Sequence, residues 1–326
     1  MRIGVVGAGA WGTALAQVAA SGGEPVLIWA LEPEVVGSIN ERRENSHYLK
    51  NIELGRSIEA VGEIERMNAC DALLLVTPAQ HLRSVVGQLE AGNKPLILCS
   101  KGIEDGSGLL MHEVAREVQP EAPIAVLSGP TFAHEVAAGL PTAVTLAVED
   151  PALGARLAER IARPFFRPYL TDDIAGAEVG GAVKNVLAIA CGIVDGKRLG
   201  LNARGALISR GFAEMTRFGI AKGARPETLA GLAGLGDLVL TCSSTNSRNF
   251  SLGKGIGEGV RAADLLADRR TVAEGAFTAP VLKREADRIG VDMPITAAVC
   301  ALLADEASVD EAVGRLLARP LRSEGV

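Results

Sequence analysis

The sequence predicts an α/β domain with a doubly wound, mostly parallel sheet, followed by an all-α C-terminal domain. Three observations support this prediction. The chain has 326 residues, which suits about two domains of ordinary size. Its first half alternates short apolar runs with helical stretches, as βαβ units do. Beyond this part, apolar residues recur at helical spacing and strand candidates are few. We therefore expect one domain over residues 1–172 and a helical domain over residues 173–326.

The strands of the first domain are predicted from short apolar runs that are bounded by Gly, Pro or polar residues. The candidates are Arg2–Val6, Val26–Trp29, Ala72–Val76, Leu96–Cys99, Ile124–Leu127 and Ala143–Val148. A helix is expected over Thr13–Ala20, between the first two strands. Strands that alternate with helices in this way favour parallel pairing.

The second domain is predicted to be helical from about residue 176 onward. The candidate helices are Gly176–Ile193, Asn202–Gly219, Arg225–Leu232, Val281–Ile289, Thr296–Leu303 and Ser308–Leu317. The first of them carries its apolar residues close to one helical face. The last begins with a capping-box spacing, since Ser308 stands three residues before Glu311.

Charge and composition exclude several classes of function. The net charge of −6 argues against an extended nucleic-acid surface. The N-terminus lacks the regions of a signal peptide, and no uninterrupted apolar run approaches about 18 residues. The five cysteines form no CxxC pair, which favours free thiols in a reducing compartment. The four histidines show no metal-ligand spacing. We expect a cytoplasmic protein with no membrane span, no nucleic-acid partner and no metal.

A glycine motif after the first strand predicts a dinucleotide site. Residues 7–12 read GAGAWG, which fits the pattern G-x-G-x-x-G between a strand and a helix. Gly7 would allow the tight turn, Gly9 would let the backbone approach a pyrophosphate, and Gly12 would let helix and strand pack closely. The helix N-terminus would then face the phosphates. This arrangement is typical of a Rossmann domain.

The choice between NAD and NADP stays open at the end of the second strand. An acidic residue about 20 positions after the glycines would bind the ribose 2′-hydroxyl. Glu32 is the acid nearest to that position, one or two residues late, and it could equally be a first-turn helix residue before Pro33. No arginine stands there to hold a 2′-phosphate.

Charged residues within apolar segments mark a second site. Lys101 follows a strand end, and Lys184 with Asn185 lies in the middle of an apolar helix. Such a lysine needs a partner or a task, unless it reaches solvent along an exposed face. Asp237 is the one charge in GLAGLGDLVL, and Lys184 is its natural partner. Alternatively, Asp237 caps the start of a short helix.

Residues 246–249 read NSRN and gather hydroxyl, guanidinium and amide groups. Such a cluster suits a phosphate, with Arg248 as the bidentate donor, although it could also be an ordinary polar loop.

Together these segments resemble the bacterial-type NAD(P)-dependent glycerol-3-phosphate dehydrogenases. The resemblance spans nearly the whole chain in the family's order. Its motifs are GAGAWGTALA at Gly7–Ala16, SKGIE at Ser100–Glu104, SGPTFAHEVAAGLPTA at Ser128–Ala143, GGAVKNVLAI at Gly180–Ile189, NARGALISRGFAEM at Asn202–Met215, GLAGLGDLVLTC at Gly231–Cys242, NSRN at Asn246–Asn249 and VAEG at Val272–Gly275.

The resemblance implies interconversion of dihydroxyacetone phosphate and sn-glycerol 3-phosphate for phospholipid synthesis, in a cleft between a Rossmann domain and a helical domain of a homodimer. It places Lys184 as proton donor or acceptor, with Lys101 and Asp237 completing the catalytic set. The cofactor positions it implies are Gly7, Gly9, Trp11, Gly12, Lys101, Ala133, Arg248, Val272 and Glu274. The substrate positions are Lys101, Gly129, Thr131, Lys184, Asn185, Asp237, Ser247, Arg248 and Asn249.

Two departures from the family pattern bear on the cofactor. Leu31 stands where a basic or imidazole side chain is common, and leucine cannot hold a 2′-phosphate. Ala10 replaces a common hydroxyl residue. The cofactor is therefore expected to be NADP or NAD, without a stated preference.

The chemistry assigns a task to the lysines. Hydride transfer to a ketone leaves an alkoxide that needs a proton. We expect Lys184 to supply it, since burial and the second cation Lys101 both favour the neutral amine after transfer. Asp237 would position that amine. Two rival functions remain: a β-hydroxyacid dehydrogenase of similar two-domain fold, which the NSRN cluster with GLGDL disfavours, and a nucleotide-sensing protein without activity, which would need neither lysine.

Overall fold

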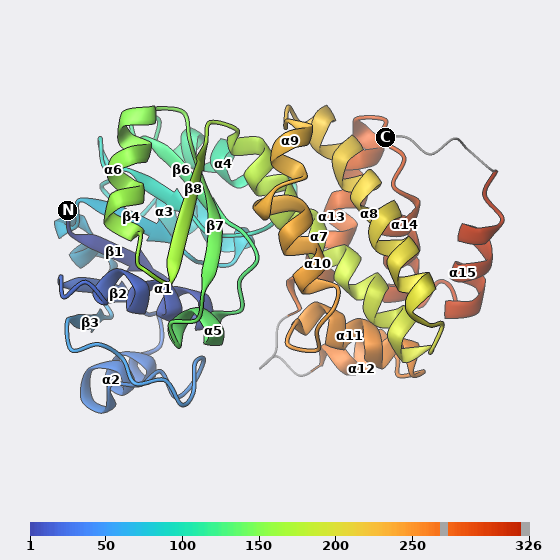
Figure 1. The fold of residues 1–326 in the computed structure, drawn as a ribbon, viewed down its shortest axis with the longest axis horizontal. Coiled ribbons are helices and arrows are strands. Elements are labelled where there is room, and N and C mark those ends of the chain that lie inside the picture. Colours follow the sequence, from blue (N-terminus) through green and yellow to red (C-terminus); the bar gives the residue numbers. More distant parts are fainter. Residues whose placement is uncertain (268–272, 321–326) are drawn as a thin grey trace. The chain divides into compact units, whose positions relative to one another are not determined.

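The computed structural model describes residues 1–267 and 273–320, and it divides the chain into two compact units (Figure 1). The first unit comprises Met1–Lys101 and Leu109–Ala177. The second comprises the short segment Gly102–Gly108 and the chain from Glu178 onward.

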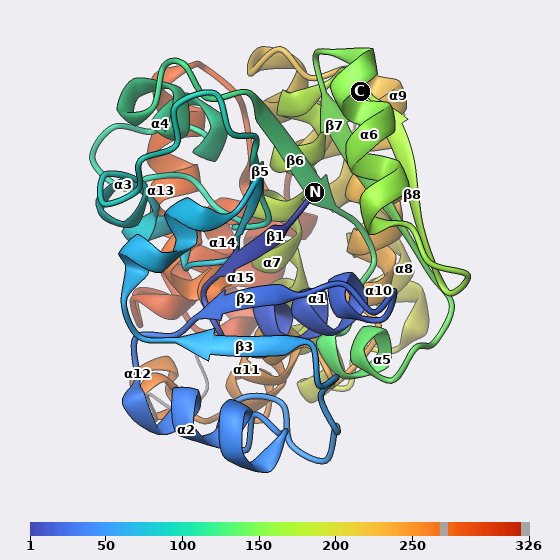
Figure 2. The ribbon, with the colours of Figure 1, turned by 90° about the vertical axis from the view of Figure 1, so that its left-hand side faces the viewer.

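The first unit contains an eight-stranded sheet with the order β3-β2-β1-β4-β5-β6-β7-β8. The strands are β1 Ile3–Val6, β2 Val26–Trp29, β3 Ile58–Val61, β4 Ala72–Leu75, β5 Leu96–Leu98, β6 Ile124–Ser128, β7 Thr142–Val148 and β8 Phe166–Thr171. All neighbours pair in parallel except β6 and β7. Figure 2 shows β3, β2 and β1 side by side. The chain therefore starts mid-sheet, and the order reverses between β1 and β4, where open α/β sheets bind ligands.

The six predicted strands are confirmed, with ends that shift by at most one residue. Sequence analysis missed β3 and β8. The β3 segment includes exposed Glu59, and β8 contains Arg167, Pro168 and the half-exposed Tyr169. Because edge strands are not buried on both faces, they lack the continuous apolar run that marks a central parallel strand.

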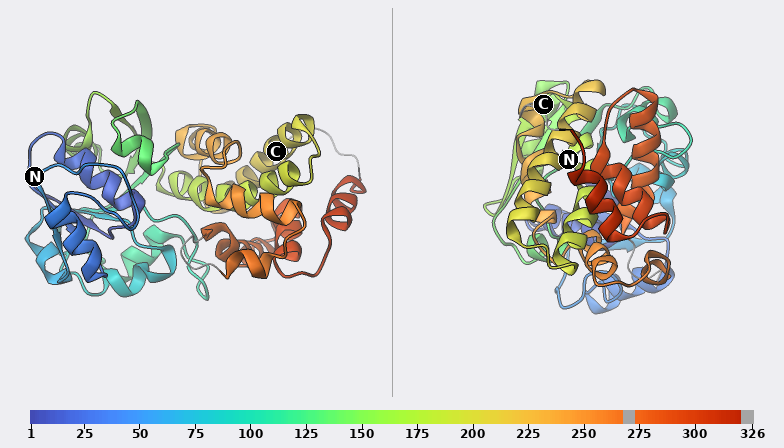
Figure 3. Two further views of the ribbon diagram at one scale, coloured as in Figure 1. Left: turned by 90° about the horizontal axis from the view of Figure 1, so that it is seen from below. Right: turned by 90° about the vertical axis from the view of Figure 1, so that its right-hand side faces the viewer.

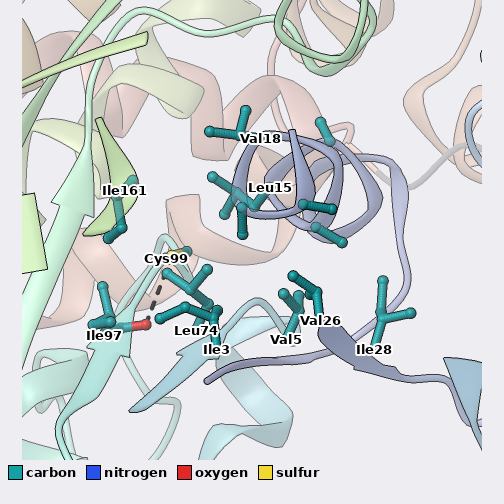
Figure 4. Packing of buried hydrophobic residues seen from close by; sticks show 14 of the residues in the cluster. Ile3, Val5, Leu15, Val18, Val26, Ile28, Leu74, Ile97, Cys99 and Ile161 are labelled. Atoms are coloured by element: carbon teal, nitrogen blue, oxygen red, sulfur yellow. Dashed lines mark hydrogen bonds between the residues drawn. The ribbon is translucent and has the colours of Figure 1, made fainter. Parts of the chain in front are cut away.

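Helices flank the sheet, and their apolar side chains pack against those of the strands to form the core. They are α1 Ala10–Ala20, α2 Pro33–Arg42, α3 Leu82–Val86, α4 Met111–Val118, α5 Ala133–Ala137 and α6 Pro151–Ile161. Figure 4 shows Leu15 and Val18 of α1 above Ile3 and Val5 of β1, all at most 1% exposed. Burying side chains of this size contributes about 1.5–3 kcal/mol each. This packing holds α1, and with it the glycine loop, against the sheet.

The described residues after Ala177 form helices and turns, with no strand among them (Figure 3). The helices of this part are α7 Ile174–Gly196, α8 Leu201–Ala221, α9 Pro226–Leu229, α10 Asp237–Thr241, α11 Arg248–Gly257, α12 Ala262–Leu266, α13 Glu274–Arg288, α14 Pro294–Leu303 and α15 Val309–Leu317. Ser308 caps α15 with the predicted box to Glu311. Sequence analysis missed α10, α11 and α12, and it began α13 seven residues too late.

The predicted helix Arg225–Leu232 was wrong at its end. Helix α9 stops at Leu229, and a π-helical turn follows over Leu232–Gly236. Gly234 packs so closely on the Leu229 carbonyl that a Cβ atom would overlap it. Gly234 therefore allows a close backbone approach that a residue with a side chain would prevent.

Helix α7 is long and apolar enough to cross a membrane, and among the described helices it alone passes that test. Its apolar window is, however, completely buried inside the protein. A core helix has the same composition as a membrane-spanning helix, so this feature is weak evidence for a span.

A close crossing of α7 and α11 uses four glycines, which we call the glycine seam: Gly192, Gly196, Gly253 and Gly257. A Cβ atom on Gly192 would overlap the Phe250 carbonyl oxygen, and one on Gly253 would overlap the Ile189 carbonyl oxygen. Gly196 and Gly257 meet backbone atoms of the opposite helix in the same way. The helices therefore touch backbone to backbone, which leaves no room for a side chain.

All five cysteines are free thiols, as predicted, and four of them are buried. Burial raises the pKa of Cys99. Burial also raises the pKa of Cys300, to about 11. Neither thiol is therefore an activated nucleophile.

A buried carboxylate on α8 holds the first turn of α14. Glu214 is 1% exposed and accepts hydrogen bonds from the backbone N–H of Ile295 (2.6 Å) and Thr296 (3.2 Å). These groups are among the N–H donors that a helix start leaves unpaired. Burial outweighs the bonds and raises the pKa of Glu214 to about 7.

This raised pKa predicts a pH-dependent stability. The ordinary value is 4.5, so the folded protein binds this proton more tightly than the unfolded chain does. Its contribution is fully present below about pH 4.5 and is lost as the pH rises through about 7. Relative to Glu214→Gln, which does not titrate, the wild-type free energy of unfolding should fall by about 3 kcal/mol across this range. Urea titrations at several pH values measure it, and a pH-independent difference would contradict it.

Candidate active site

The glycine loop has the geometry that the motif predicts. Gly7 follows β1 with φ +113°, and a Cβ atom there would lie 3.1 Å from the Val76 backbone. Gly9 has open space around it. A Cβ atom on Gly12 would overlap the Gly7 carbonyl oxygen. Turn, open approach and close packing are therefore each assigned to the expected glycine.

Three buried donors of the first unit, one in the glycine loop and two near the ends of β4 and β6, have no hydrogen-bond partner among the described residues. Gly9 is the N-cap of α1 and offers no side chain, so no side chain caps the first N–H groups of α1, which is the arrangement that suits an anion. The buried Trp11 Nε1, Thr77 Oγ1 and Ser128 Oγ have no hydrogen-bond partner within the described part of the chain. A buried donor without a partner costs about 1–3 kcal/mol, which a bound polar ligand would recover. A dinucleotide fits this donor set.

Thr77 and Ser128 were not among the predicted site residues. Both stand at the carboxyl end of a parallel strand, β4 for Thr77 and β6 for Ser128. Ser100, just after β5, donates to the Thr77 carbonyl at 2.5 Å. The position of a small hydroxyl residue at the end of a strand was the signal that could have identified them.

Glu32 lies at the end of β2 as the N-cap residue of α2. Its Oε1 accepts a hydrogen bond of 2.8 Å from the Tyr48 hydroxyl, and this bond raises the pKa of Tyr48. The preceding Leu31 is 75% exposed. A carboxylate beside an apolar side chain is thus held at the place where the second strand meets its helix.

The remaining predicted residues of the first unit follow β5 and β6. Lys101 comes three residues after β5. Gly129 has φ +155°, and a Cβ atom there would lie 3.0 Å from Val144 Cα. Thr131 donates its hydroxyl to the Gly129 carbonyl at 3.3 Å, and Ala133 begins α5. Lys101 thus follows β5, the neighbour of β4, whereas Gly129, Thr131 and Ala133 follow β6, one strand further along the sheet.

In the second unit, Lys184 and Asp237 form a buried ion pair. Lys184 Nζ lies 2.5 Å from Asp237 Oδ1, and the Asp237 side chain is 0% exposed. The prediction that they are partners is confirmed. The alternatives were wrong, because Lys184 does not reach solvent and Gly236, not Asp237, is the N-cap of α10. Thr241, missed by sequence analysis, donates to Asp237 Oδ1 at 3.3 Å from one helical turn further on.

The π-helical turn explains how Asp237 reaches Lys184. Gly180 of α7 lies so close to the Ala233 carbonyl that a Cβ atom would overlap it. This glycine is one turn before Lys184 on the same helix. The turn therefore contacts α7 directly and delivers Asp237 to the amine. Short π-helical segments are frequent at functional sites.

A second polar group joins three helices. Asn249 Nδ2 donates to Asn185 Oδ1 at 3.0 Å, and Asn249 Oδ1 accepts from Gly275 N–H at 2.8 Å. Ser247 is the N-cap of α11, and its Oγ accepts from Phe250 N–H at 3.2 Å. The NSRN segment is thus the start of a ten-residue helix rather than an ordinary loop.

This arrangement presents one proton-bearing amine and one place for an anion. Arg248 is the exposed first residue of α11, beside the positive end of the helix. Glu274 begins α13 next to Gly275, whereas Val272 lies outside the described residues. Within residues 1–267 and 273–320, no group of three His, Cys, Asp or Glu side chains could hold a metal.

Both halves of the chain match family models. Residues 2–154 match the NAD-dependent glycerol-3-phosphate dehydrogenase N-terminus, and residues 173–314 match the C-terminus of the same family. The chain is 60% identical over 324 residues to glycerol-3-phosphate dehydrogenase (NAD(P)+) 1 from Sphingopyxis alaskensis, covering 99% of this chain and 98% of that protein. It is 62% identical to the Erythrobacter litoralis protein of the same activity name, with the same coverage. The crystal structure of glycerol-3-phosphate dehydrogenase from Coxiella burnetii is similar with a TM-score of 0.93 at 38% identity, covering 98% of this chain and 99% of that one.

Proposed function

Since this chain belongs to the family of NAD(P)-dependent glycerol-3-phosphate dehydrogenases, we propose that the buried Lys184–Asp237 pair carries out the proton transfer of the family's reaction. The protein is an oxidoreductase that uses NAD or NADP and acts on glycerol 3-phosphate. This family membership excludes the two rival functions, a β-hydroxyacid dehydrogenase and a sensor without activity. The ion pair is the observation that carries the proposal.

The cofactor would be held by the glycine loop. Bound there, NAD(P)H supplies the hydride. Gly7, Gly9 and Gly12 shape the loop, and the N-terminus of α1 attracts the pyrophosphate. Trp11 offers its unpaired indole N–H. We assign further cofactor contacts to Lys101, Ala133, Arg248, Val272 and Glu274.

The substrate would be bound through its phosphate and its carbonyl group. Arg248, Ser247 and Asn249 suit the phosphate, because a guanidinium group and a helix start both favour a dianion. Asn185 is fixed by its bond to Asn249, which leaves its side-chain amide group to donate. We assign further substrate contacts to Gly129 and Thr131.

The proton balance of the reaction assigns the catalytic roles. In reduction, the carbonyl carbon gains the hydride and the carbonyl oxygen gains a proton from Lys184. The amine is then neutral and regains a proton from solvent before the next turnover. Asp237 positions the amine through the 2.5 Å contact, and Thr241 holds Asp237. Lys101 supplies a second positive charge toward the developing alkoxide.

The roles of the two domains follow from these assignments. Residues 1–172 would bind the dinucleotide, and residues 173–326 would supply the acid and the phosphate site. We further propose a cytoplasmic homodimer that serves phospholipid synthesis. The free thiols support this proposal, because free thiols are usual in a reducing compartment.

One assay tests the proposed function. Dihydroxyacetone phosphate reduction is followed with NADH and with NADPH side by side, and glycerol 3-phosphate oxidation with NAD and NADP. Turnover with a hydroxyacid but not with glycerol 3-phosphate would contradict it.

The surroundings of β2 predict a preference for NADH. A 2′-phosphate would meet the Glu32 carboxylate and the apolar Leu31, and neither can bind it. Leu31→Arg is expected to raise kcat/KM for NADPH about tenfold, because a guanidinium binds a phosphate as a fork. The matched control Leu31→Gln adds polarity without charge and should leave the NADPH value near that of wild type. An equal gain in both variants would argue against a charge effect.

A further inference from the structure

The chain leaves the first unit immediately after Lys101 and returns to it at Leu109. The seven residues between, Gly102–Gly108, belong to the second unit, and we call them the strap. The chain thus passes into the second unit for these seven residues, well before it passes there finally after Ala177. The first residue of the strap is bonded covalently to Lys101, the residue to which cofactor and substrate contacts are assigned above.

The strap is a folded turn. Ile103 is wholly buried. Gly108 N–H donates to the Glu104 carbonyl at 3.0 Å, and the Ser107 hydroxyl donates to Glu104 Oε2 at 2.6 Å. Gly102 and Gly108, at its two ends, have φ +151° and +70°. Residues other than glycine rarely adopt these φ values, so the backbone at both ends of the strap requires glycine.

The strap is held by charged groups of the second unit, centred on the buried carboxylate of Glu285 on α13. Lys222 Nζ, just after α8, donates to the Gly108 carbonyl at 3.2 Å and to Glu285 Oε1 at 2.8 Å. Arg288 donates two bonds of 2.7 Å to the same carboxylate, which is 3% exposed. These bonds lower the pKa of Glu285 to about 2. Arg284 on α13 also pairs with Asp105.

The grip is steric as well as electrostatic. A Cβ atom on Gly108 would lie 2.6 Å from Glu285 Oε2. That oxygen cannot swing away easily, because Arg288 holds it and Lys222 holds the other oxygen of the same carboxylate. Glu285 thus lies where a side chain on Gly108 would stand, beside the residue whose carbonyl Lys222 binds.

We propose that Glu285, with Lys222, is a positioning residue for the reaction: it holds the strap to the helical unit and thereby sets the backbone position of Lys101. The inference rests on the role proposed for Lys101. A buried ion pair adds little net stability over apolar packing, so we assign this pair a geometric role rather than a stabilising one. A misplacement of about 1 Å far from the chemistry can cost about 10²-fold in rate.

The first test replaces the carboxylate. Glu285→Gln and Lys222→Met are each expected to lower kcat/KM for dihydroxyacetone phosphate by about 10–100-fold. Gly108→Ala keeps every charge but forces the strap away from Glu285, so the same direction of change is expected. Lys283→Met removes an exposed ion pair with Asp287 on the same helix and should leave kcat/KM unchanged. Glu214→Gln is the control for loss of a buried carboxylate elsewhere in this unit.

A double-mutant cycle separates positioning from general destabilisation. If Glu285 acts through Lys101, then Glu285→Gln should cost far less in a Lys101→Met background than in wild type. Lys222→Arg keeps a charged donor at this position, so it should retain more of the wild-type kcat/KM than Lys222→Met does. Suppose that Lys101→Met alone lowers kcat/KM. Equal losses from Glu285→Gln in both backgrounds, or no loss from Glu285→Gln in wild type, would then overturn the inference about the strap. Wild-type kcat/KM in Lys101→Met would instead overturn the role proposed for Lys101 and the inference with it.

Discussion

Replacing Lys184 by alanine is expected to lower kcat for dihydroxyacetone phosphate reduction by about 10²–10⁴-fold, the usual contribution of a positioned acid. The alkoxide that forms would have to take its proton from water. The glycine loop lies in the other unit, so NADH binding should survive. Steady-state kinetics measure the first quantity and nucleotide fluorescence titration the second.

The alanine variant leaves Asp237 buried without its cation. Removing one partner of a buried pair costs about 3–5 kcal/mol, so the loss of activity could reflect unfolding. Lys184→Arg is the matched control, because arginine keeps the positive charge but does not release a proton at any relevant pH. An inactive, folded Lys184→Arg enzyme that binds NADH supports proton transfer. Turnover near the wild-type rate in either variant would contradict it.

Gly253→Val is expected to lower the free energy of unfolding by about 4 kcal/mol or more, since overpacking against a rigid backbone lies at the upper end of such effects. A Cβ atom at this position already overlaps the Ile189 carbonyl oxygen. The two helices of the glycine seam would have to separate. Because α11 carries Asn249 and α7 carries Asn185, their 3.0 Å bond should break, and KM for the substrate should rise. Urea unfolding and steady-state kinetics measure the two effects.

Gly205→Val is the matched control for the seam. Gly205 lies in α8 with no atom within 4 Å of its would-be Cβ, so the valine meets open space. In a helix, glycine and valine differ by only a few tenths of a kcal/mol. Near-wild-type stability is therefore expected. Equal destabilisation by both substitutions would show that helix propensity, not the close crossing, sets the requirement for glycine.

Much of the fold could be predicted because its signals are local. A central parallel strand such as β1 or β4 is buried on both faces and so appears as an unbroken apolar run. The glycine loop could be assigned residue by residue, since the motif and its place between a strand and a helix are both local in sequence. The edge strands β3 and β8 were not predicted, because one side of each has no neighbouring strand and polar residues are tolerated there.

The site was predicted in part. An isolated lysine and an isolated aspartate in apolar surroundings must find partners, and Lys184 with Asp237 fulfils that requirement. Thr77 and Ser128 were missed although each is a small hydroxyl residue at the end of a parallel strand, and only the structure shows that these hydroxyls are buried without a partner among the described residues. The same is true of Glu285, which in sequence is one more charge on an amphipathic helix.

What can be learned from the residues alone is therefore what neighbours along the chain decide: strand against helix, the turn at Gly7, the capping box at Ser308. Tertiary structure decided which distant groups meet. The Asn249–Asn185 bond joins positions 64 residues apart, and the Lys222–Gly108 bond joins positions 114 residues apart. Both depend on how closely distant segments pack, which is set by excluded volume across whole surfaces rather than by any local preference.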